Sequence, residues 1–448
     1  MNGPAASKFY LVFASVLAAS SAFAQGNAST DPMALFNVGR DQSEAYKVND
    51  HIYVAFGFGN TFLVITPDGN VVVDTSIAFM ARRHKQLLTK VSDGPVKYII
   101  LTHGHGDHTG GVPLWKGEGT DVIAQENFVE FQHYQARLRG LFARRNAAQF
   151  PRLAASGGAR SSQAAALNPG NYVADIAATI LFDESHTLKV GGLTFELYHT
   201  PGETYDHLTV CIPELKAAFT GDNFYDSFPN LYTLRGTEPR FALDYVESLN
   251  RVMELKPVIL LPSHGEPIAG NAEITRRLTK YRDAILYVHD ATVQGMNEGK
   301  DVYALMQEIK LPTELDVGEG YGTIAWSVRG IYEGYVGWFD GNPATMYETP
   351  TAAVYPDLVE MAGGADAVAA RAEALRQEGR LQEALHMADV ALAADPENLT
   401  ALRARLAAFE SLRAQSRNSN ESGWLEHGMS ETRKQIEKAE EFTSAPSN

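Results

Sequence analysis

The residues with the clearest chemical potential lie in the run THGHGDHTGG at residues 102–111. Six consecutive positions there hold three imidazoles and one carboxylate: His103, His105, Asp107 and His108. The intervening glycines let the backbone turn without side-chain clashes. Imidazole nitrogen and carboxylate oxygen together suit zinc, and a metal site with an open position is catalytic rather than structural. The run therefore predicts a catalytic metal site. The alternative is an accidental histidine cluster on a solvated loop.

Other candidate ligands also follow apolar, strand-like segments. The segment at 98–101 leads into the histidine-rich run, and similar segments precede Glu203, Asp222 and His264. Strands that end along one rim of a sheet sandwich bring residues distant in sequence to one point. We therefore expect these three side chains to join the histidine-rich run in a single site. The alternative for Asp222 is a simple helix cap.

Two further histidines are rival ligands. His199 stands two residues before Pro201. It is either a metal ligand or a residue that packs at the end of a strand. His207 either binds metal directly, donates a hydrogen bond to a metal-bound carboxylate or contacts substrate. The residues alone leave these alternatives open.

The composition limits the classes of partner and substrate. The chain has 448 residues, enough for two or three domains, and 45% hydrophobic with 21% charged residues is typical of a globular protein with an ample core. Its formal net charge of −16 argues against a nucleic-acid partner, because phosphate binding needs a basic face. An anionic substrate therefore requires a local positive site, such as metal ions or an arginine.

The first 25 residues have the pattern of a signal peptide. Lys8 supplies a positive start, residues 9–18 an apolar stretch, and Ala22-Phe23-Ala24 a small-x-small cleavage signature. The pattern predicts export, to the periplasm or beyond the cell. An anchoring helix is the weaker alternative, because the apolar run is short of a membrane span. We expect no membrane span in the mature protein.

The order of elements predicts an α/β domain followed by helices. Strand-like segments, a helical stretch at 80–91 and further strands alternate in the first half of the chain. Beyond about residue 350 alanine-rich helical stretches follow, at 366–378, 381–394 and 399–415. They resemble one tetratricopeptide-like repeat with an extra helix, and we expect them to form a homodimer. The alternative is a helical cap that folds onto its own chain.

The order of these motifs resembles the metallo-β-lactamase fold. The histidine-rich run is followed by Thr-Pro-Gly at 200–202, Gly-Asp at 221–222 and Ser-His at 263–264. Glu203 stands where most members of that superfamily have a histidine, as a glutamate does in the alkylsulfatase branch. The segment NLYTLRG at 230–236 resembles a motif of linear alkylsulfatases, and GWFDGNP at 337–343 resembles the family's passage into its dimerisation domain.

The resemblance covers roughly residues 50 to 425 and implies the architecture. The expected fold class is α/β, a metallo-β-lactamase αββα sandwich followed by an all-α, tetratricopeptide-like dimerisation domain. The expected division of the chain is a signal peptide at 1–25, a catalytic domain at 26–345, a helical dimerisation domain at 346–430 and a polar tail at 431–448.

The resemblance also implies roles for individual residues. One zinc ion would be bound by His103, His105 and Glu203, and a second by Asp107, His108 and His264. Asp222 would bridge the two, although alkylsulfatases usually have glutamate there. Water held between the ions would be the nucleophile, with Asp107 and Asp222 as the catalytic carboxylates. The residues expected to hold the sulfate are Asn230, Thr233 and Arg235.

The expected function is thus that of an exported di-zinc hydrolase of sulfate monoesters, with alkyl sulfates as the small-molecule substrates. One alternative keeps the metals but changes the substrate to a lactone, β-lactam or phosphoester. Another is a non-catalytic metal-binding scaffold that binds partners through its helices.

Overall fold

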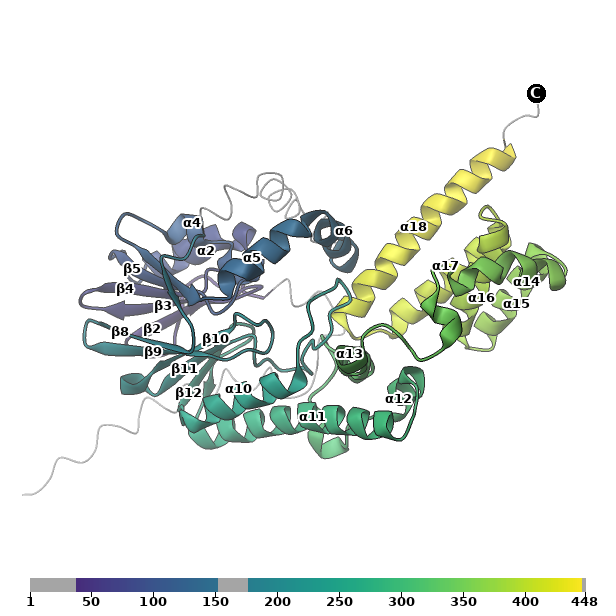
Figure 1. Ribbon diagram of the computed structural model, residues 1–448. Helices are drawn as coiled ribbons and strands as arrows, with labels where there is room; N and C mark the ends of the chain where they lie inside the picture. The colour runs from purple at the N-terminus through teal and green to yellow at the C-terminus, as the bar shows by residue number, and fades with distance from the viewer. Residues whose placement is uncertain (1–37, 152–175, 445–448) are drawn as a thin grey trace, which may run out of the picture.

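The computed structural model describes residues 38–151 and 176–444 (Figure 1). The signal peptide expected at 1–25 lies outside the described residues. Two sheets stack face to face at the centre of the catalytic half, and helices cover both outer faces.

The first sheet has seven strands in chain order, antiparallel from β1 to β4 and parallel from β4 to β7. A tight turn at Pro67 and Asp68 joins β3 to β4. The strands are β1 (Tyr46–Lys47), β2 (Ile52–Ala55), β3 (Thr61–Thr66), β4 (Gly69–Val73), β5 (Val96–Ile100), β6 (Asp121–Gln125) and β7 (Ile180–Phe182).

The second sheet has six strands in the order β13-β12-β11-β10-β9-β8. Only the β11–β12 pair is parallel, with Gly221 opposite Pro262. The strands are β8 (Ser185–Val190), β9 (Leu193–His199), β10 (Leu208–Ile212), β11 (Ala217–Gly221), β12 (Ile259–Pro262) and β13 (Ile268–Ala269).

Alternate residues of the strands divide between an inner and an outer core. Phe62 of β3 meets Phe219 of β11 between the sheets, with ring centroids 5.2 Å apart. Leu63, the next residue, faces the opposite way and packs with Leu88 of helix α2 (Ala78–Thr89). Successive strand side chains point to opposite faces, so a run of apolar residues can fill both layers. The expected αββα sandwich is confirmed.

The first sheet carries α2 to α6 and the second carries α10 to α13 (Figure 1). These helices are α2 (Ala78–Thr89), α3 (Gly106–Thr109), α4 (Val112–Trp115), α5 (Phe128–Arg137), α6 (Arg139–Gln149), α10 (Ala242–Glu254), α11 (Asn271–Asn297), α12 (Val302–Glu308) and α13 (Ile324–Val336). Short 3-10 turns are η1 (Pro213–Leu215), η2 (Thr313–Leu315), η3 (Pro343–Met346) and η4 (Thr351–Val354).

The C-terminal part is entirely helical within the described residues, as the sequence predicts. Its helices are α14 (Tyr355–Met361), α15 (Ala365–Gln377), α16 (Leu381–Ala394), α17 (Leu399–Gln415) and α18 (Ser419–Ser444). Small side chains let them approach closely, because Ala372, Ala388 and Ala404 from three successive helices share one buried cluster.

Helix α18 runs through the boundary at which a polar tail is expected. Thr432 is buried, and Arg433 pairs with Glu410 of α17 at 2.7 Å. The backbone is helical up to Ser444, and most residues of 431–441 lie on the outer side of this docked helix, where a polar tail was expected. The N-terminal end of α18 lies against α6 (Figure 1).

Within residues 38–151 and 176–444, no helix is both long enough and apolar enough to cross a membrane.

Candidate active site

The candidate ligands lie where strands end, at one rim of the sandwich. Residues 103–108 follow β5, Asp222 follows β11 directly, and His264 follows β12. Since β11 and β12 are parallel neighbours, their carboxyl ends lie side by side. Two separate sheets therefore contribute side chains to the same place.

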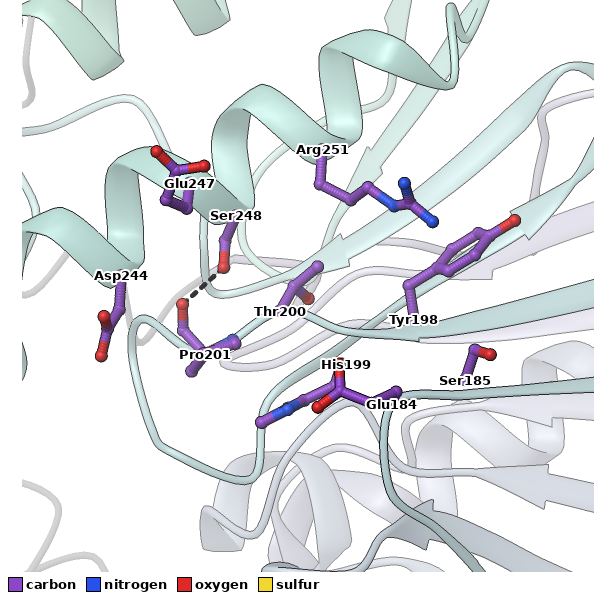
Figure 2. Close-up of a pocket in the computed structure, with 10 residues that line it drawn as sticks. All are labelled: Glu184, Ser185, Tyr198, His199, Thr200, Pro201, Asp244, Glu247, Ser248 and Arg251. Atoms are coloured by element: carbon purple, nitrogen blue, oxygen red, sulfur yellow. Dashed lines mark hydrogen bonds between the residues drawn. The ribbon is translucent and has the colours of Figure 1, made fainter.

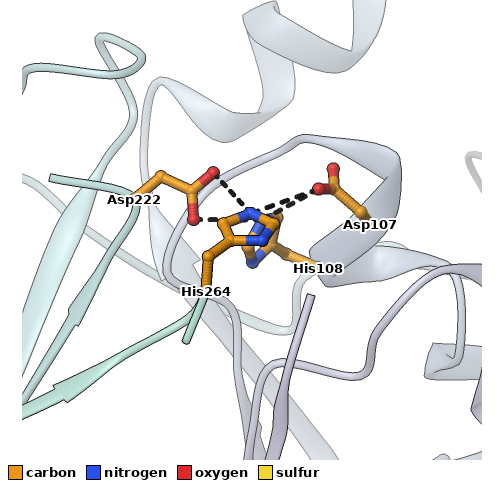
Figure 3. Close-up of side chains that lie close together, drawn as sticks. All are labelled: Asp107, His108, Asp222 and His264. Carbon is orange, nitrogen blue, oxygen red and sulfur yellow. Dashed lines mark hydrogen bonds and ion pairs between the residues drawn. The ribbon is translucent and has the colours of Figure 1, made fainter. Parts of the chain in front are cut away.

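Four of the expected ligands form one compact group, Asp107, His108, Asp222 and His264, whose donor atoms all lie within 4.8 Å of one another (Figure 3). The Nε2 atom of His264 lies 3.1 Å from Asp222 Oδ2 and 3.5 Å from Asp107 Oδ2. The Nε2 atom of His108 lies 3.4 Å from Asp222 Oδ1. Two imidazoles and two carboxylates thus converge on a single point.

Asp222 also belongs to a second group, with His103 and His105. His103 Nε2 lies 2.9 Å from His105 Nδ1 and 3.8 Å from Asp222 Oδ2. Glu203 stands beside this group, with Oε1 3.9 Å from His105 Nδ1. The structure therefore brings all seven expected ligands together, with Asp222 between the two groups.

Buried atoms that lack partners indicate what the site accommodates. Among the described residues, His108 Nε2, Asp222 Oδ1 and Glu203 Oε2 are buried without a hydrogen bond. Such atoms carry a desolvation cost unless a ligand satisfies them. Nitrogen and oxygen donors about 2.0–2.2 Å from a zinc ion stand a few ångströms from each other, as these donors do. The donor set fits divalent cations.

Asp74, which the sequence analysis did not single out, orients the histidine-rich run. Its Oδ2 accepts hydrogen bonds from His108 Nδ1 at 2.9 Å, from the Thr102 hydroxyl at 2.8 Å and from the Ser263 hydroxyl at 2.7 Å. A hydrogen bond at Nδ1 leaves His108 Nε2 free to face the site. The signal was present in the sequence, since the strand-like segment 71–73 ends at Asp74 just as other strands end at ligands.

His207 supports Asp222 from behind and is not placed as a ligand. Its Nε2 atom accepts the backbone N–H of Asp222 at 3.1 Å, and its ring stacks against His103 with centroids 5.2 Å apart. Burial lowers the pKa of His207 to about 4, so the ring is neutral and Nε2 accepts.

His199 belongs to neither of the two ligand groups found among the described residues. Its Nε2 donates to the carbonyl oxygen of Tyr205 at 2.9 Å. Figure 2 shows it in a separate pocket between β9 and α10, where Arg251 lies over the ring of Tyr198. The reading of His199 as a residue that packs at a strand end is the one that fits.

Of the expected sulfate-binding residues, Arg235 lies beside His105 and contacts Thr233. Arg235 Nη1 donates to the Thr233 hydroxyl at 3.1 Å, and Arg235 Nη2 lies 3.4 Å from His105 Nε2. Asn230 is fully buried, and within the described residues its side-chain amide has no hydrogen-bond partner. A guanidinium with free donors next to the ligand groups suits an oxyanion.

Arg240 is a second cation that the sequence analysis missed. Its Nη1 lies 2.5 Å from Glu203 Oε1 and 2.8 Å from the carbonyl oxygen of Asn230. Burial raises the pKa of Glu203 to about 7, against the opposing charge of Arg240. The residue lies just outside the Thr-Leu-Arg-Gly motif, which explains why the motif did not reveal it.

The charges of the two carboxylate–imidazole pairs reinforce one another. Burial opposes ionisation of Asp222, yet His108 and His264 hold its pKa well below the usual range. Burial alone would lower the pKa of His264, but Asp222 and Asp107 raise it to about 10. The site is therefore a concentrated set of opposite charges that a cation can enter by displacing protons from the imidazoles.

Comparisons with known proteins identify two families along the chain. Residues 54–264 match the metallo-beta-lactamase superfamily, and residues 302–435 match the alkyl sulfatase dimerisation family. A linear primary-alkylsulfatase from Pseudomonas is 30% identical over 379 residues, which cover 81% of this chain and 72% of that protein. An alkyl/aryl-sulfatase from Saccharomyces cerevisiae is 28% identical over 84% of this chain and 61% of its own length.

More distant similarities extend to secondary alkylsulfatases. An (R)-specific secondary-alkylsulfatase from Pseudomonas is 27% identical over 72% of this chain and 52% of its own length. A solved structure of a stereoselective inverting secondary alkylsulfatase from Pseudomonas aligns with a TM-score of 0.78 and 24% identity, over 88% of this chain and 66% of that one. That alignment supports the fold.

Proposed function

This chain belongs to the alkylsulfatases of the metallo-β-lactamase superfamily, and from that premise we propose that it hydrolyses sulfate monoesters, with alkyl sulfates as substrates. The observation that carries the proposal is the contact of Arg235 with His105 at 3.4 Å, because it sets an anion-binding guanidinium beside the metal-type ligands. A sulfate ester needs both, since negative charge grows on its oxygens as the ester bond breaks.

We propose two zinc ions as the cofactors. His103, His105 and Glu203 would hold one, Asp107, His108 and His264 the other, with Asp222 shared between them. Bound there, the ions would neutralise the sulfate and make a water molecule more acidic.

The protein side chains have distinct tasks in this proposal. Arg235, Thr233 and Asn230 bind the sulfate oxygens and fix their orientation. Asp107 would take up the proton that the attacking water loses, and its side chain, at 18% exposure, is the less enclosed of the two proposed catalytic carboxylates. Asp222, at 8% exposure, is the more enclosed carboxylate and holds the two ligand groups together.

A hydrolysis panel on purified, zinc-loaded protein tests the proposal. The substrates are short and long alkyl sulfates, an aryl sulfate, a lactone, a β-lactam and a phosphate monoester. We expect turnover of the sulfate esters. Turnover of another class without sulfate turnover would replace the assignment, and metal binding without turnover of any substrate would favour a non-catalytic scaffold.

We also propose that the protein is a homodimer. Large apolar side chains are exposed along residues 335–361, inside the segment that matches the dimerisation family. Trp338 is 75% exposed and Met361 is 84% exposed. We name this set the apolar surface: Tyr335, Val336, Trp338, Phe339, Met346, Tyr347, Val354, Leu358 and Met361. Exposed apolar residues in such number mark an interaction site.

Export is the last part of the proposal and rests on the sequence pattern of residues 1–25. Mass determination of the N-terminus after expression in a Gram-negative host, with periplasmic and cytoplasmic fractions separated, would test it. A mature chain that begins near Gln25 in the periplasm is the expected result.

A further inference from the structure

A short loop between η2 and α13 brings Tyr321 to the active site. The backbone N–H of Tyr321 donates to the Ser227 hydroxyl at 3.1 Å, and Gly322 N donates to the carbonyl of Phe228 at 3.2 Å. No side chain fits at Gly322, since a Cβ there would lie 2.1 Å from the carbonyl oxygen of Pro229. The loop is thus packed directly against the segment that continues into Asn230.

The ring of Tyr321 stands against active-site residues. It meets the Tyr225 ring edge-on, with centroids 5.8 Å apart and an interplanar angle of 88°. Tyr225 in turn stands edge-on to His264, with centroids 6.4 Å apart, and its hydroxyl accepts the backbone N–H of Asn230 at 2.8 Å. Tyr321 therefore contacts Tyr225, and Tyr225 contacts both the candidate metal ligand His264 and Asn230 of the segment proposed to bind sulfate.

The N-terminal end of α18 holds this loop from the other side. Asn418 Nδ2 donates to the carbonyl oxygens of Glu319 and Tyr321, at 2.8 and 2.9 Å, and Asn420 Nδ2 donates to that of Tyr321 at 3.0 Å. Asn420 Oδ1 accepts from Gln149 at the end of α6, at 2.8 Å. We name Asn418 and Asn420 the clasp.

The side-chain amides of the clasp are buried, and this burial favours one arrangement of the loop against α18. Asn418 is 5% exposed and Asn420 is fully buried. Buried amides that lose their partners cost free energy, so the arrangement of the loop and α18 is strongly favoured over others. The position of Tyr321 is accordingly fixed by a helix almost 100 residues further along the chain.

The phenol has the properties of a hydrogen-bond donor to an anion. Among the described residues its hydroxyl has no hydrogen-bond partner, and the charges of Arg235, Glu203, Asp107 and Arg240 all act on it. Burial raises the pKa of Tyr321 to about 12, so its O–H is intact at neutral pH. A neutral donor near a guanidinium adds directionality to the binding of an oxyanion.

We propose that Tyr321 is a substrate-binding residue whose hydroxyl donates a hydrogen bond to an oxygen of the sulfate ester, and that the clasp positions it. The C-terminal segment that matches the dimerisation family then also supplies part of the active site. The inference rests on the proposed function, since it names a further contact to the same substrate.

The test compares four proteins, all zinc-loaded: wild type, Tyr321→Phe, Asn418→Asp and the double variant. Tyr321→Phe removes only the hydroxyl. Asn418→Asp keeps the oxygen that accepts from the backbone N–H groups of Asn420 and Glu421, and so keeps the cap of α18. It removes the two hydrogen bonds that Asn418 Nδ2 donates to the loop, while the one from Asn420 stays. Tyr287→Phe, on the exposed side of α11, is the matched control.

We expect Tyr321→Phe to lower kcat/KM for an alkyl sulfate by about ten- to a hundredfold, as for the loss of one hydrogen bond to a charged group, with metal content and Tm unchanged. Asn418→Asp should lower kcat/KM in the wild-type background and have little further effect beside Tyr321→Phe, because positioning acts through the tyrosine.

Full activity of Tyr321→Phe, beside an active wild type, would overturn the substrate contact alone. Independent, multiplicative losses in the double variant would overturn the positioning role of the clasp. If the wild type turns over no sulfate ester, the proposed function fails first and the contact to sulfate fails with it.

Discussion

The guanidinium of Arg240 lies 2.5 Å from the carboxylate of Glu203, and both side chains are buried. Glu203 is the only carboxylate expected beside His103 and His105 other than the shared Asp222. Arg240 opposes the rise in the pKa of Glu203 that burial causes. The pair links the motif around Thr200-Pro201-Gly202 to the segment proposed to bind sulfate, because Arg240 also donates to the carbonyl oxygen of Asn230.

Replacement of Arg240 should weaken metal binding. Arg240→Gln leaves Glu203 buried without its cation, which raises the pKa of the carboxyl further and favours the protonated form. The variant should therefore lose metal at neutral pH and regain it as the pH rises, because metal binding requires the deprotonated carboxylate. Metal content after dialysis at several pH values measures this. Equal metal content in variant and wild type at every pH would contradict it.

Replacement of Asp74 should affect the group around His108. Asp74→Asn removes an acceptor that receives three side-chain hydrogen bonds, including the one from His108 Nδ1. We expect metal affinity to fall by about ten- to a hundredfold, as is usual when the partner of a metal-binding histidine is lost. Titration with a chromophoric chelator gives the affinity, and Asp93→Asn, at an exposed position, is the control. An unchanged metal affinity would show that Asp74 does not support metal binding through His108.

Glycine is required where β11 meets Asp222. Gly221 has φ +51°, and a Cβ there would lie 2.3 Å from His207 Nε2. Gly221→Ala should therefore destabilise the fold by about 1–3 kcal/mol and displace the histidine that supports Asp222. Gly192→Ala is the matched control, since Gly192 has φ +86° but open space around it. Similar free energies of unfolding for the two variants would show that the contact with His207 does not matter.

The apolar surface should control oligomeric state. Trp338→Asp places a charge where 75% of a large aromatic side chain is exposed. We expect light scattering after gel filtration to report a dimer for wild type and a monomer for this variant, with little change in Tm. Leu181→Asp, at 44% exposure on β7, should remain dimeric. A dimer that survives Trp338→Asp would place the interface elsewhere.

The sequence predicted the fold and the convergence of the ligands because both depend on local patterns. Apolar segments that end in His103, Asp222 or His264 can be read directly, and parallel strands then carry these residues to one rim. The supporting residues could not be predicted in the same way. Asp74 acts on His108 only once β4 and β5 are paired, and Arg240 reaches Glu203 only through the folded loop.

The C-terminal segment is a second case in which contacts made only in the folded chain could not be predicted from the sequence. The polarity of residues 431–444 favours a tail, yet the segment is helical because α17 offers partners such as Glu410 for Arg433. Asn418 and Asn420 belong to no recognisable motif, and their role near Tyr321 follows from contacts between residues about 100 positions apart.

The central claim is that this site hydrolyses sulfate monoesters through Arg235. The most direct measurement is kcat/KM for an alkyl sulfate in zinc-loaded wild type, Arg235→Lys and Arg235→Ala, with metal content determined on each sample. We expect Arg235→Ala to lose at least about a hundredfold, as for one donor to a developing oxyanion, and Arg235→Lys to recover only part of the activity, while all three proteins keep their metal. Equal kcat/KM in wild type and Arg235→Ala would contradict the assignment of this site to sulfate esters.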